Sequence, residues 1–378
     1  MVTTFAGWTL VGLSLLGSLY ASLACAATLA WLKRPRPTAR VAPDVTVIKP
    51  LCGAPPGLAA ILDRFCVQDY AGAVQIVFGV HDSADPAIAI VRDLQRAHPD
   101  RDIALMVDPR IHGANLKASN LINIIKTARH EVLILSDADI VVETDYIRTV
   151  VGALAQPGVG LVSCLYVGRE RTGLWSQLSA MAITYQFMPG AILGKAGRLA
   201  EPCFGSTIAI RADVLARTGG FAAFADHLAD DYEIGAAVRR LGLKIALPPI
   251  TVAHICDEAD ARALIERELR WGRVVRQISP LGYAGSLITY PLPLMVLGAA
   301  LLGFSGAAML LLLATLASRL VFKLAIDFAA KAPAGRWWLM PVSDTLAFGL
   351  FLASFGVNRV DWRGARFRVS REGALLPS

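Results

Sequence analysis

The sequence has 378 residues, of which 55% are hydrophobic and only 18% charged, with a mean hydropathy of +0.51 and a formal net charge of +7. Soluble domains carry roughly 25% charged residues, so part of this chain is expected to lie in lipid. The positive charge could suit nucleic acid, an anionic membrane or a phosphate-bearing substrate. The polar region has no basic run with interleaved aromatic residues, which argues against nucleic acid as a partner.

The first 32 residues contain no charged side chain and predict an N-terminal transmembrane helix over residues 1–32. About 20 apolar residues suffice to cross the hydrocarbon core. A cleaved signal peptide would have basic residues before its apolar stretch, whereas here they follow it, in a proline-containing linker over residues 33–44. Because positive charge favours the cytoplasmic side, the domain that follows is predicted to face the cytoplasm.

The polar region over residues 45–278 predicts a domain with a regular strand–helix repeat. Four β-branched apolar runs begin 29 residues apart, at Val45, Val74, Ile103 and Val132, with helix-like segments between them. This spacing is typical of βαβ units, and continuous apolar strands favour a parallel sheet covered on both faces. The expected fold class is therefore α/β with a mostly parallel sheet, in which ligands bind beyond the carboxyl ends of the strands.

Acidic residues follow the second and fourth of these strands. Asp82 comes after the second strand, and Asp137 and Asp139 come after the fourth, in the segment SDAD. Side chains two apart in an extended segment point to the same side, so Asp137 and Asp139 form a carboxylate pair. A hard cation such as Mg²⁺ or Mn²⁺ prefers such ligands together with substrate phosphates. The pair predicts a metal site, unless the segment is only an acidic turn that caps the next helix.

Two further clusters lie later in the domain. Asp230 and Asp231 stand at the start of a predicted helix, where one carboxylate suffices as a cap and the other could serve chemistry. In the segment RELRW, Arg267, Arg270 and Trp271 share one face of a helix. These arginines could bind a diphosphate leaving group, or they could contact lipid phosphates at the membrane surface.

Residues 279–357 predict a C-terminal membrane region of two or three apolar helices, followed by a basic tail at 358–378. No charged residue lies between Arg276 and Arg319, and this stretch is long enough for two spans. The next apolar stretch contains a single charged residue, Asp344. A third crossing would place the basic tail outside, against the positive-inside rule. The apolar segment 174–193 is predicted to lie in the membrane interface, because a crossing there would separate the carboxylates. The tail motif at 361–364 suggests no more than a surface contact.

The six cysteines are scattered and include no CxxC pair. This spacing argues against a zinc site or a disulfide framework and fits a reducing compartment.

The order of these motifs resembles the ceramide glucosyltransferase family, a membrane branch of the inverting glycosyltransferases. That family has three spaced aspartates followed by Gln/Arg-x-x-Arg-Trp, matched here by HDSADPAIAI (Asp82), SDADI (Asp137), LADDYEIG (Asp231) and RELRW. The stretch VDPRIHGANLKASNLINI and the full Asp-x-Asp look most similar to bacterial hopanoid-biosynthesis glycosyltransferases. The resemblance implies a Rossmann-like nucleotide-diphospho-sugar transferase domain flanked by transmembrane helices.

The resemblance also implies an activity: inverting transfer from a UDP-sugar to a hydroxyl of a membrane lipid, best matched by N-acetylglucosamine passing to a polyhydroxylated hopanoid. The residue roles that it implies are nucleotide-sugar binding by Asp82, Lys117 and Asp137, metal binding (Mg²⁺ or Mn²⁺) by Asp137 and Asp139, proton removal by Asp231, leaving-group assistance by Arg270 with Arg267, and a pocket wall from Trp271. The expected location is the inner (cytoplasmic) membrane of a bacterium.

Three other functions stay open from the sequence. The closest alternative is UDP-glucose:ceramide glucosyltransferase, with the same chemistry on another lipid. A polysaccharide synthase would share the carboxylates, but it usually has Gln where this chain has Arg267, and more spans. A non-catalytic membrane scaffold would not be expected to keep the acidic and RELRW motifs intact.

Overall fold

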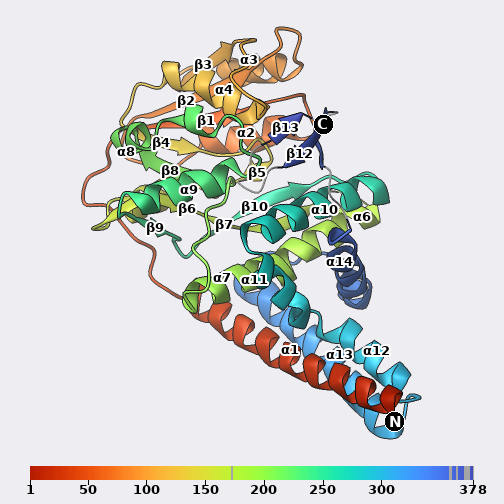
Figure 1. Cartoon of the computed structure of the whole chain (residues 1–378). Helices are drawn as coiled ribbons and strands as arrows, with labels where there is room; N and C mark the ends of the chain where they lie inside the picture. The colour runs from red at the N-terminus through yellow and green to blue at the C-terminus, as the bar shows by residue number, and fades with distance from the viewer. Residues whose placement is uncertain (172, 357–359, 363–364, 370–374, 378) are drawn as a thin grey trace.

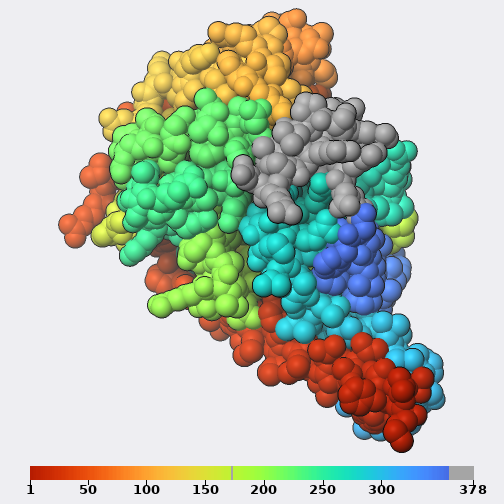
Figure 2. Space-filling model, viewed as in Figure 1, coloured from red at the N-terminus to blue at the C-terminus, as the bar shows by residue number. Residues whose placement is uncertain are grey.

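The computed structural model describes residues 1–171, 173–356, 360–362, 365–369 and 375–377. An α/β domain stands above a slanting bundle of long helices, and the N-terminus lies at the far end of that bundle (Figure 1). In the space-filling view, the red N-terminal helix lies along the outside of the bundle (Figure 2).

A seven-stranded sheet of order β3-β2-β1-β4-β8-β6-β9 forms the centre of the domain. Strands β1 to β4 are parallel, β8 is antiparallel to both of its neighbours, and β6 and β9 are parallel. The α/β fold class with a mostly parallel sheet is confirmed. The strands are β1 (Val45–Pro50), β2 (Val74–Val80), β3 (Asp102–Val107), β4 (Val132–Leu135), β6 (Val159–Ser163), β8 (Ile208–Arg211) and β9 (Lys244–Ala246).

Strands that are evenly spaced in the sequence pair in register, so that their first residues lie side by side. Val45 pairs with Val74 on one side and with Val132 on the other. The carboxyl ends of β1, β2 and β4 therefore meet at one edge, where the acidic segments begin. Consecutive residues of β1 pack on opposite faces of the sheet, Val47 in one apolar core and Ile48 in the other. The covering helices are α2 (Leu58–Cys66), α3 (Ala87–Ala97), α4 (Leu116–Ile124), α5 (Tyr146–Leu154), α8 (Ala212–Arg217) and α9 (Asp230–Arg240), with short 3-10 turns η1 (Ile125–Thr127) and η3 (Phe221–Phe224).

A second sheet of three strands, in the order β5-β10-β7, lies between the domain and the bundle. Its strands are β5 (Ile140–Val141), β7 (Leu165–Glu170) and β10 (Thr251–Cys256). Because β5 begins immediately after Asp139, the acidic segment leads directly into this small sheet. Helices α6 (Gly173–Ala182), η2 (a π-helix, Ile183–Phe187), α7 (Met188–Ala196) and α10 (Ala261–Ile278) accompany it. Most of the segment predicted to lie in the membrane interface is buried within this packing.

Within the described residues, two helices are long and apolar enough to span a membrane, α1 (Val2–Leu32) and α13 (Gly306–Ala330). A bent pair makes a third candidate: α11 (Pro280–Gly285) with η4 (Ser286–Thr289), and α12 (Pro291–Leu301) at 65° to them. Small residues let α1 approach this pair closely, since a Cβ on Gly17 would lie 2.1 Å from the carbonyl oxygen of Ile288. The Ser14 hydroxyl donates to the carbonyl of Pro291 at 2.7 Å.

The last apolar stretch forms α14 (Met340–Ser354), preceded by η5 (Trp337–Leu339). At 15 residues it is shorter than the roughly 20 needed for a crossing, and it packs against α10 and α6. Its single charge, Asp344, accepts two hydrogen bonds of 2.8 Å from Arg319 of α13, and both side chains are buried. Strands β11 (Val360–Trp362), β12 (Ala365–Val369) and β13 (Leu375–Pro377) form an antiparallel sheet. The motif predicted at 361–364 lies partly outside the described residues.

Candidate active site

The carboxylate pair lies where β4 ends, and its backbone is held by a buried lysine. Lys49 of β1 is fully buried, and its Nζ donates to the backbone carbonyl of Asp137 at 2.8 Å. The same Nζ lies 3.8 Å from the centre of the Phe65 ring. Burial lowers the pKa of Lys49 to about 7, and the charges of Asp137 and Asp139 offset only part of that effect.

Lys117 joins the Asp137 carboxylate to the acidic start of α9. Its Nζ lies 2.6 Å from Asp137 Oδ1 and 3.9 Å from Asp230 Oδ2. Asn115 caps α4 by accepting a hydrogen bond from the backbone N–H of Ala118, which places Lys117 on the first turn of that helix. Burial alone would lower the pKa of Lys117, but the surrounding aspartates outweigh burial and raise it. Lys117 therefore keeps its positive charge among these carboxylates.

Asp139 faces the small sheet, where it lies beside His254 of β10. The two side chains are 3.6 Å apart, from Nδ1 to Oδ2. Burial would raise the pKa of Asp139, but His254 outweighs that effect and the pKa falls to about 2. In turn, Asp139 raises the pKa of His254 against the effect of burial. The second oxygen of Asp139, Oδ1, is buried and has no hydrogen-bond partner in the described part of the chain.

Asp231 lies on the other side of Lys117, on the first turn of α9. Its Oδ2 accepts a hydrogen bond of 2.8 Å from the backbone N–H of Gly205. Burial, and next the charge of Asp230, raise the pKa of Asp231 to about 6. A Cβ on Gly205 would lie 2.9 Å from Lys117 Nζ and 3.1 Å from Asp137 Oδ2. These functional groups therefore surround one glycine, with no room for a side chain there.

The RELRW segment lies on α10 and reaches the site through His254. The His254 and Trp271 rings are 6.1 Å apart, and the Arg267 guanidinium lies 4.8 Å from the centre of the Trp271 ring. Arg267 pairs with Glu258 and, at 2.8 Å, with Glu268, and its side chain is only 11% exposed. Two carboxylates thus already neutralise Arg267, and its assistance to a leaving group stays a prediction. Arg270 lies one turn further along the same helix and is partly buried.

Asp82 stands apart from this cluster. It is exposed in the loop after β2, and its Oδ1 accepts a hydrogen bond of 2.8 Å from the backbone N–H of Ala84. Among the described residues, no hydrogen bond or ion pair joins it to Lys117 or Asp137. Its role in nucleotide binding, implied by the family resemblance and by its place at the same edge of the sheet, stays a prediction.

The acidic pair fits a divalent cation that arrives with a diphosphate. No group of three His, Cys, Asp or Glu side chains within the described ranges could hold an ion alone. Mg²⁺ is usually bound by one or two carboxylates, and substrate phosphates and water complete its coordination. Asp137 and Asp139 could provide the two carboxylates. The unpartnered buried Oδ1 of Asp139 is the atom that such an ion would satisfy.

Lys49, His254 and Gly205 were not identified from the sequence as parts of the site. Lys49 and His254 each interrupt an apolar strand, in VTVIKP and TVAHIC, and a polar residue in such a strand is a usable signal. Gly205 carries no comparable signal, because its importance comes from side chains far away in the sequence.

The sheet topology, with two carboxylates beyond β4, a lysine beside them and an aspartate at the start of α9, defines a GT-A nucleotide-sugar transferase fold. The same fold occurs in a mannosyltransferase from Pyrobaculum calidifontis, solved in complex with GDP-Man and Mn²⁺. The two structures superpose with a TM-score of 0.56 at 22% sequence identity, over 93% of this chain and 99% of the other.

The chain belongs to glycosyl transferase family 21, whose model matches residues 9–375. It is 25% identical to ceramide glucosyltransferase 1 of Caenorhabditis elegans over 231 residues, which cover 61% of this chain and 49% of the relative. It is 22% identical to ceramide glucosyltransferase 3 of the same organism over an equal length, 61% of this chain and 50% of the relative. The chain thus spans about half the length of these curated relatives.

Proposed function

We propose that this glycosyltransferase moves a hexose from a UDP-sugar to the hydroxyl of a ceramide-like membrane lipid, and that the hexose is glucose. The observation that carries the proposal is Asp231, a carboxylate with a pKa of about 6, beside the Lys117–Asp137 pair. The names of the two nematode relatives favour a ceramide acceptor over the hopanoid expected first from the sequence. Transfer of N-acetylglucosamine to a hopanoid stays a prediction that the same assay tests.

The donor diphosphate would bind at the edge formed by β1, β2 and β4. Asp137 and Asp139 would hold Mg²⁺ or Mn²⁺, which would neutralise the charge that grows on the departing UDP. Lys117 keeps its proton and would add positive charge beside the same phosphates. Arg270 would contact the leaving group from α10, and Asp82 would lie near the nucleoside.

Asp231 would act as the general base. The lipid hydroxyl oxygen forms a bond to the anomeric carbon while the bond from that carbon to UDP breaks, and Asp231 takes the hydroxyl proton. Attack from the face opposite UDP inverts the anomeric centre. General-base catalysis contributes about 10²–10⁴-fold, and it is most efficient when the pKa lies near the working pH. With a pKa of about 6, Asp231 is mostly ionised at neutral pH and still basic enough to accept the proton.

The proposed topology has the catalytic domain and the basic tail in the cytoplasm. Helix α1 would cross with its basic end inside, α12 would enter the membrane and α13 would return. Because α14 packs beside α10 and does not cross, the tail would stay on the cytoplasmic side. The domain boundaries proposed from the sequence, at 32, 44, 278 and 357, are compatible with this arrangement. Trp271 and the segment 174–193 would line the route of the lipid acceptor.

The decisive experiment uses the purified full chain in phosphatidylcholine nanodiscs that contain either ceramide or a polyhydroxylated hopanoid. Release of UDP is measured with UDP-glucose and with UDP-N-acetylglucosamine, and the lipid product is identified by mass spectrometry. We expect the fastest release with UDP-glucose and ceramide. If only a hopanoid product forms, the acceptor is the hopanoid and not ceramide. UDP release that is equally fast without any lipid would refute lipid transfer. Asp231→Asn serves as the matched control, since it should bind UDP-sugar without transferring it.

A further inference from the structure

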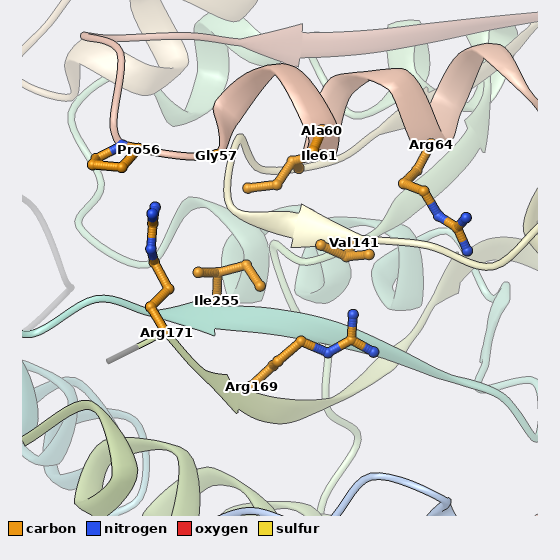
Figure 3. A pocket seen from close by; sticks show the side chains of 9 residues that line it. All are labelled: Pro56, Gly57, Ala60, Ile61, Arg64, Val141, Arg169, Arg171 and Ile255. Carbon is orange, nitrogen blue, oxygen red and sulfur yellow. The ribbon is translucent and has the colours of Figure 1, made fainter. Parts of the chain in front are cut away.

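A second pocket, of about 480 Å³, lies behind the small sheet, between α2 and strands β5, β7 and β10 (Figure 3). This arginine pocket is lined by Pro56, Gly57, Ala60, Ile61, Arg64, Val141, Arg169, Arg171 and Ile255. Ile255 follows His254 on β10, so the two side chains point to opposite faces of the sheet. The arginine pocket and the candidate active site therefore lie on the two sides of one thin sheet.

Among the described residues, three guanidinium groups and no carboxylate line the arginine pocket. Arg64 pairs with Glu143 at 2.9 Å, and Arg171 lies 3.4 Å from Asp257; both acids stand outside the lining. Arg169 is exposed, and within the described residues its side chain forms no hydrogen bond or ion pair. In Figure 3, Arg64 and Arg169 point toward each other across Val141, one from α2 and the other from β7. Within the part of the chain that the structure describes, the charge of Arg169 therefore has no counter-ion at this end of the pocket.

The opposite end is positive as well. The guanidinium of Arg171 approaches the start of α2, where Nη1 would lie 3.5 Å from a Cβ on Gly57 (Figure 3). No side chain caps that helix end. The first N–H groups of a helix carry partial positive charge, so an arginine there meets a charge of its own sign. An anion between them would relieve this repulsion, whereas water alone would relieve it less.

We propose that the arginine pocket binds a phosphate group, supplied either by a free phosphate compound or by the headgroup of an anionic lipid. Guanidinium groups bind phosphate through paired N–H···O bonds, and arginines from two separate elements make such a site selective for phosphate over a spherical anion. The apolar side chains of Ile61 and Ile255 lie between the two charged ends (Figure 3), so a phosphate attached to a small organic body fits better than the bare ion. The proposal does not depend on the transferase activity.

The test measures thermal denaturation of the full chain in nanodiscs. One arm titrates inorganic phosphate and glycerol phosphate into phosphatidylcholine nanodiscs, and the other compares phosphatidylcholine with mixed phosphatidylcholine–phosphatidylglycerol nanodiscs. A ligand that binds only the folded state raises the denaturation midpoint with concentration. We expect Arg169→Gln/Arg171→Gln to weaken the response by about tenfold or more, because the two changes remove charge-assisted hydrogen bonds from both ends of the pocket.

Matched variants separate this pocket from other basic surfaces. Arg92→Gln removes an exposed arginine of α3 that does not line the pocket and should respond like the wild type. A response that survives in the double variant belongs to another site, including the donor diphosphate site. If the double variant loses the midpoint shift caused by soluble phosphate, the ligand is a free phosphate compound. If it loses the shift caused by phosphatidylglycerol, the ligand is a lipid headgroup. The proposal is refuted if neither probe shifts the wild type, or if the double variant and Arg92→Gln respond alike.

Discussion

The pKa of Asp231 makes the rate of sugar transfer depend on pH in a defined direction. Burial and the charge of Asp230 raise that pKa to about 6. A general base acts only as the carboxylate, so the rate should rise with pH through about 6 and level off above it. With this pKa, about nine tenths of Asp231 is ionised at pH 7 and about one tenth at pH 5. The rate at pH 5 should therefore be roughly a tenth of the rate at pH 7.

The perturbation that tests this cause is Asp230→Asn. It removes the neighbouring negative charge that contributes to the raised pKa, so the acid limb of the pH–rate profile should move to lower pH. Asp231→Asn should instead lower the plateau rate by about 10²–10⁴-fold at every pH. The two changes alter one carboxylate each, yet only one of them removes the base.

The assay is the initial rate of UDP release in lipid nanodiscs, measured across the acid limb with saturating donor. Lys49, whose pKa is lowered to about 7, could add a second change near neutrality. The Asp230→Asn shift distinguishes the two groups, since Asp230 raises the pKa of Asp231 but is not among the charges that act on Lys49. A profile that stays flat between pH 5 and pH 7, or an acid limb that does not move in Asp230→Asn, would refute the assignment of Asp231.

Three further predictions follow from individual contacts. Chelation of divalent metal should abolish transfer, and Asp139→Asn should require more Mn²⁺ for half-maximal rate; full activity in EDTA would contradict the metal site. Gly205→Ala should lower the rate by about 10²-fold at an unchanged denaturation midpoint, because its Cβ would displace the lysine–aspartate pair, whereas Gly349→Ala, which meets nothing within 4 Å, should be neutral. Arg319→Leu should destabilise the protein by about 3–5 kcal/mol by leaving Asp344 buried and unpaired, and adding Asp344→Leu should restore most of that stability in thermal denaturation.

The sequence predicted the central sheet well because its signal is local and repeated. The 29-residue interval between apolar runs became the in-register pairing of Val45 with Val74 and Val132. Parallel strands of equal spacing must end at one edge, so the place of Asp137 and Asp139 followed from the repeat alone. The family motifs then added Asp231, at the start of a helix whose position in space the repeat does not specify.

The rest of the site depends on pairings between distant segments, which no local pattern reveals. The contact between Asp139 and His254 joins residues more than 100 positions apart, through the antiparallel pairing of β5 with β10. Arg267 is a second example. The RELRW spacing places Arg267 on one helix face with Arg270 and Trp271, and the fold brings Glu258 against Arg267 and neutralises it. Helix periodicity predicts which residues share a face, but it does not predict what that face meets.

The apolar helices of the bundle also constrain the position of the RELRW helix, through contacts with α14. At the C-terminal end of α10, Arg276 donates to the backbone carbonyl of Ser354 at 2.7 Å, and Ser354 Oγ lies 2.9 Å from the hydroxyl of Tyr283. Ser354 ends α14, the helix that the Arg319–Asp344 pair ties to α13. A buried ion pair is weak evidence for stability, but it specifies one arrangement of helices, since any other leaves a charge unpaired in a dry environment. The charged pair inside the bundle is thus linked through α14 to the helix that carries Trp271 to His254, and we expect a domain cut from these apolar helices to lose that constraint.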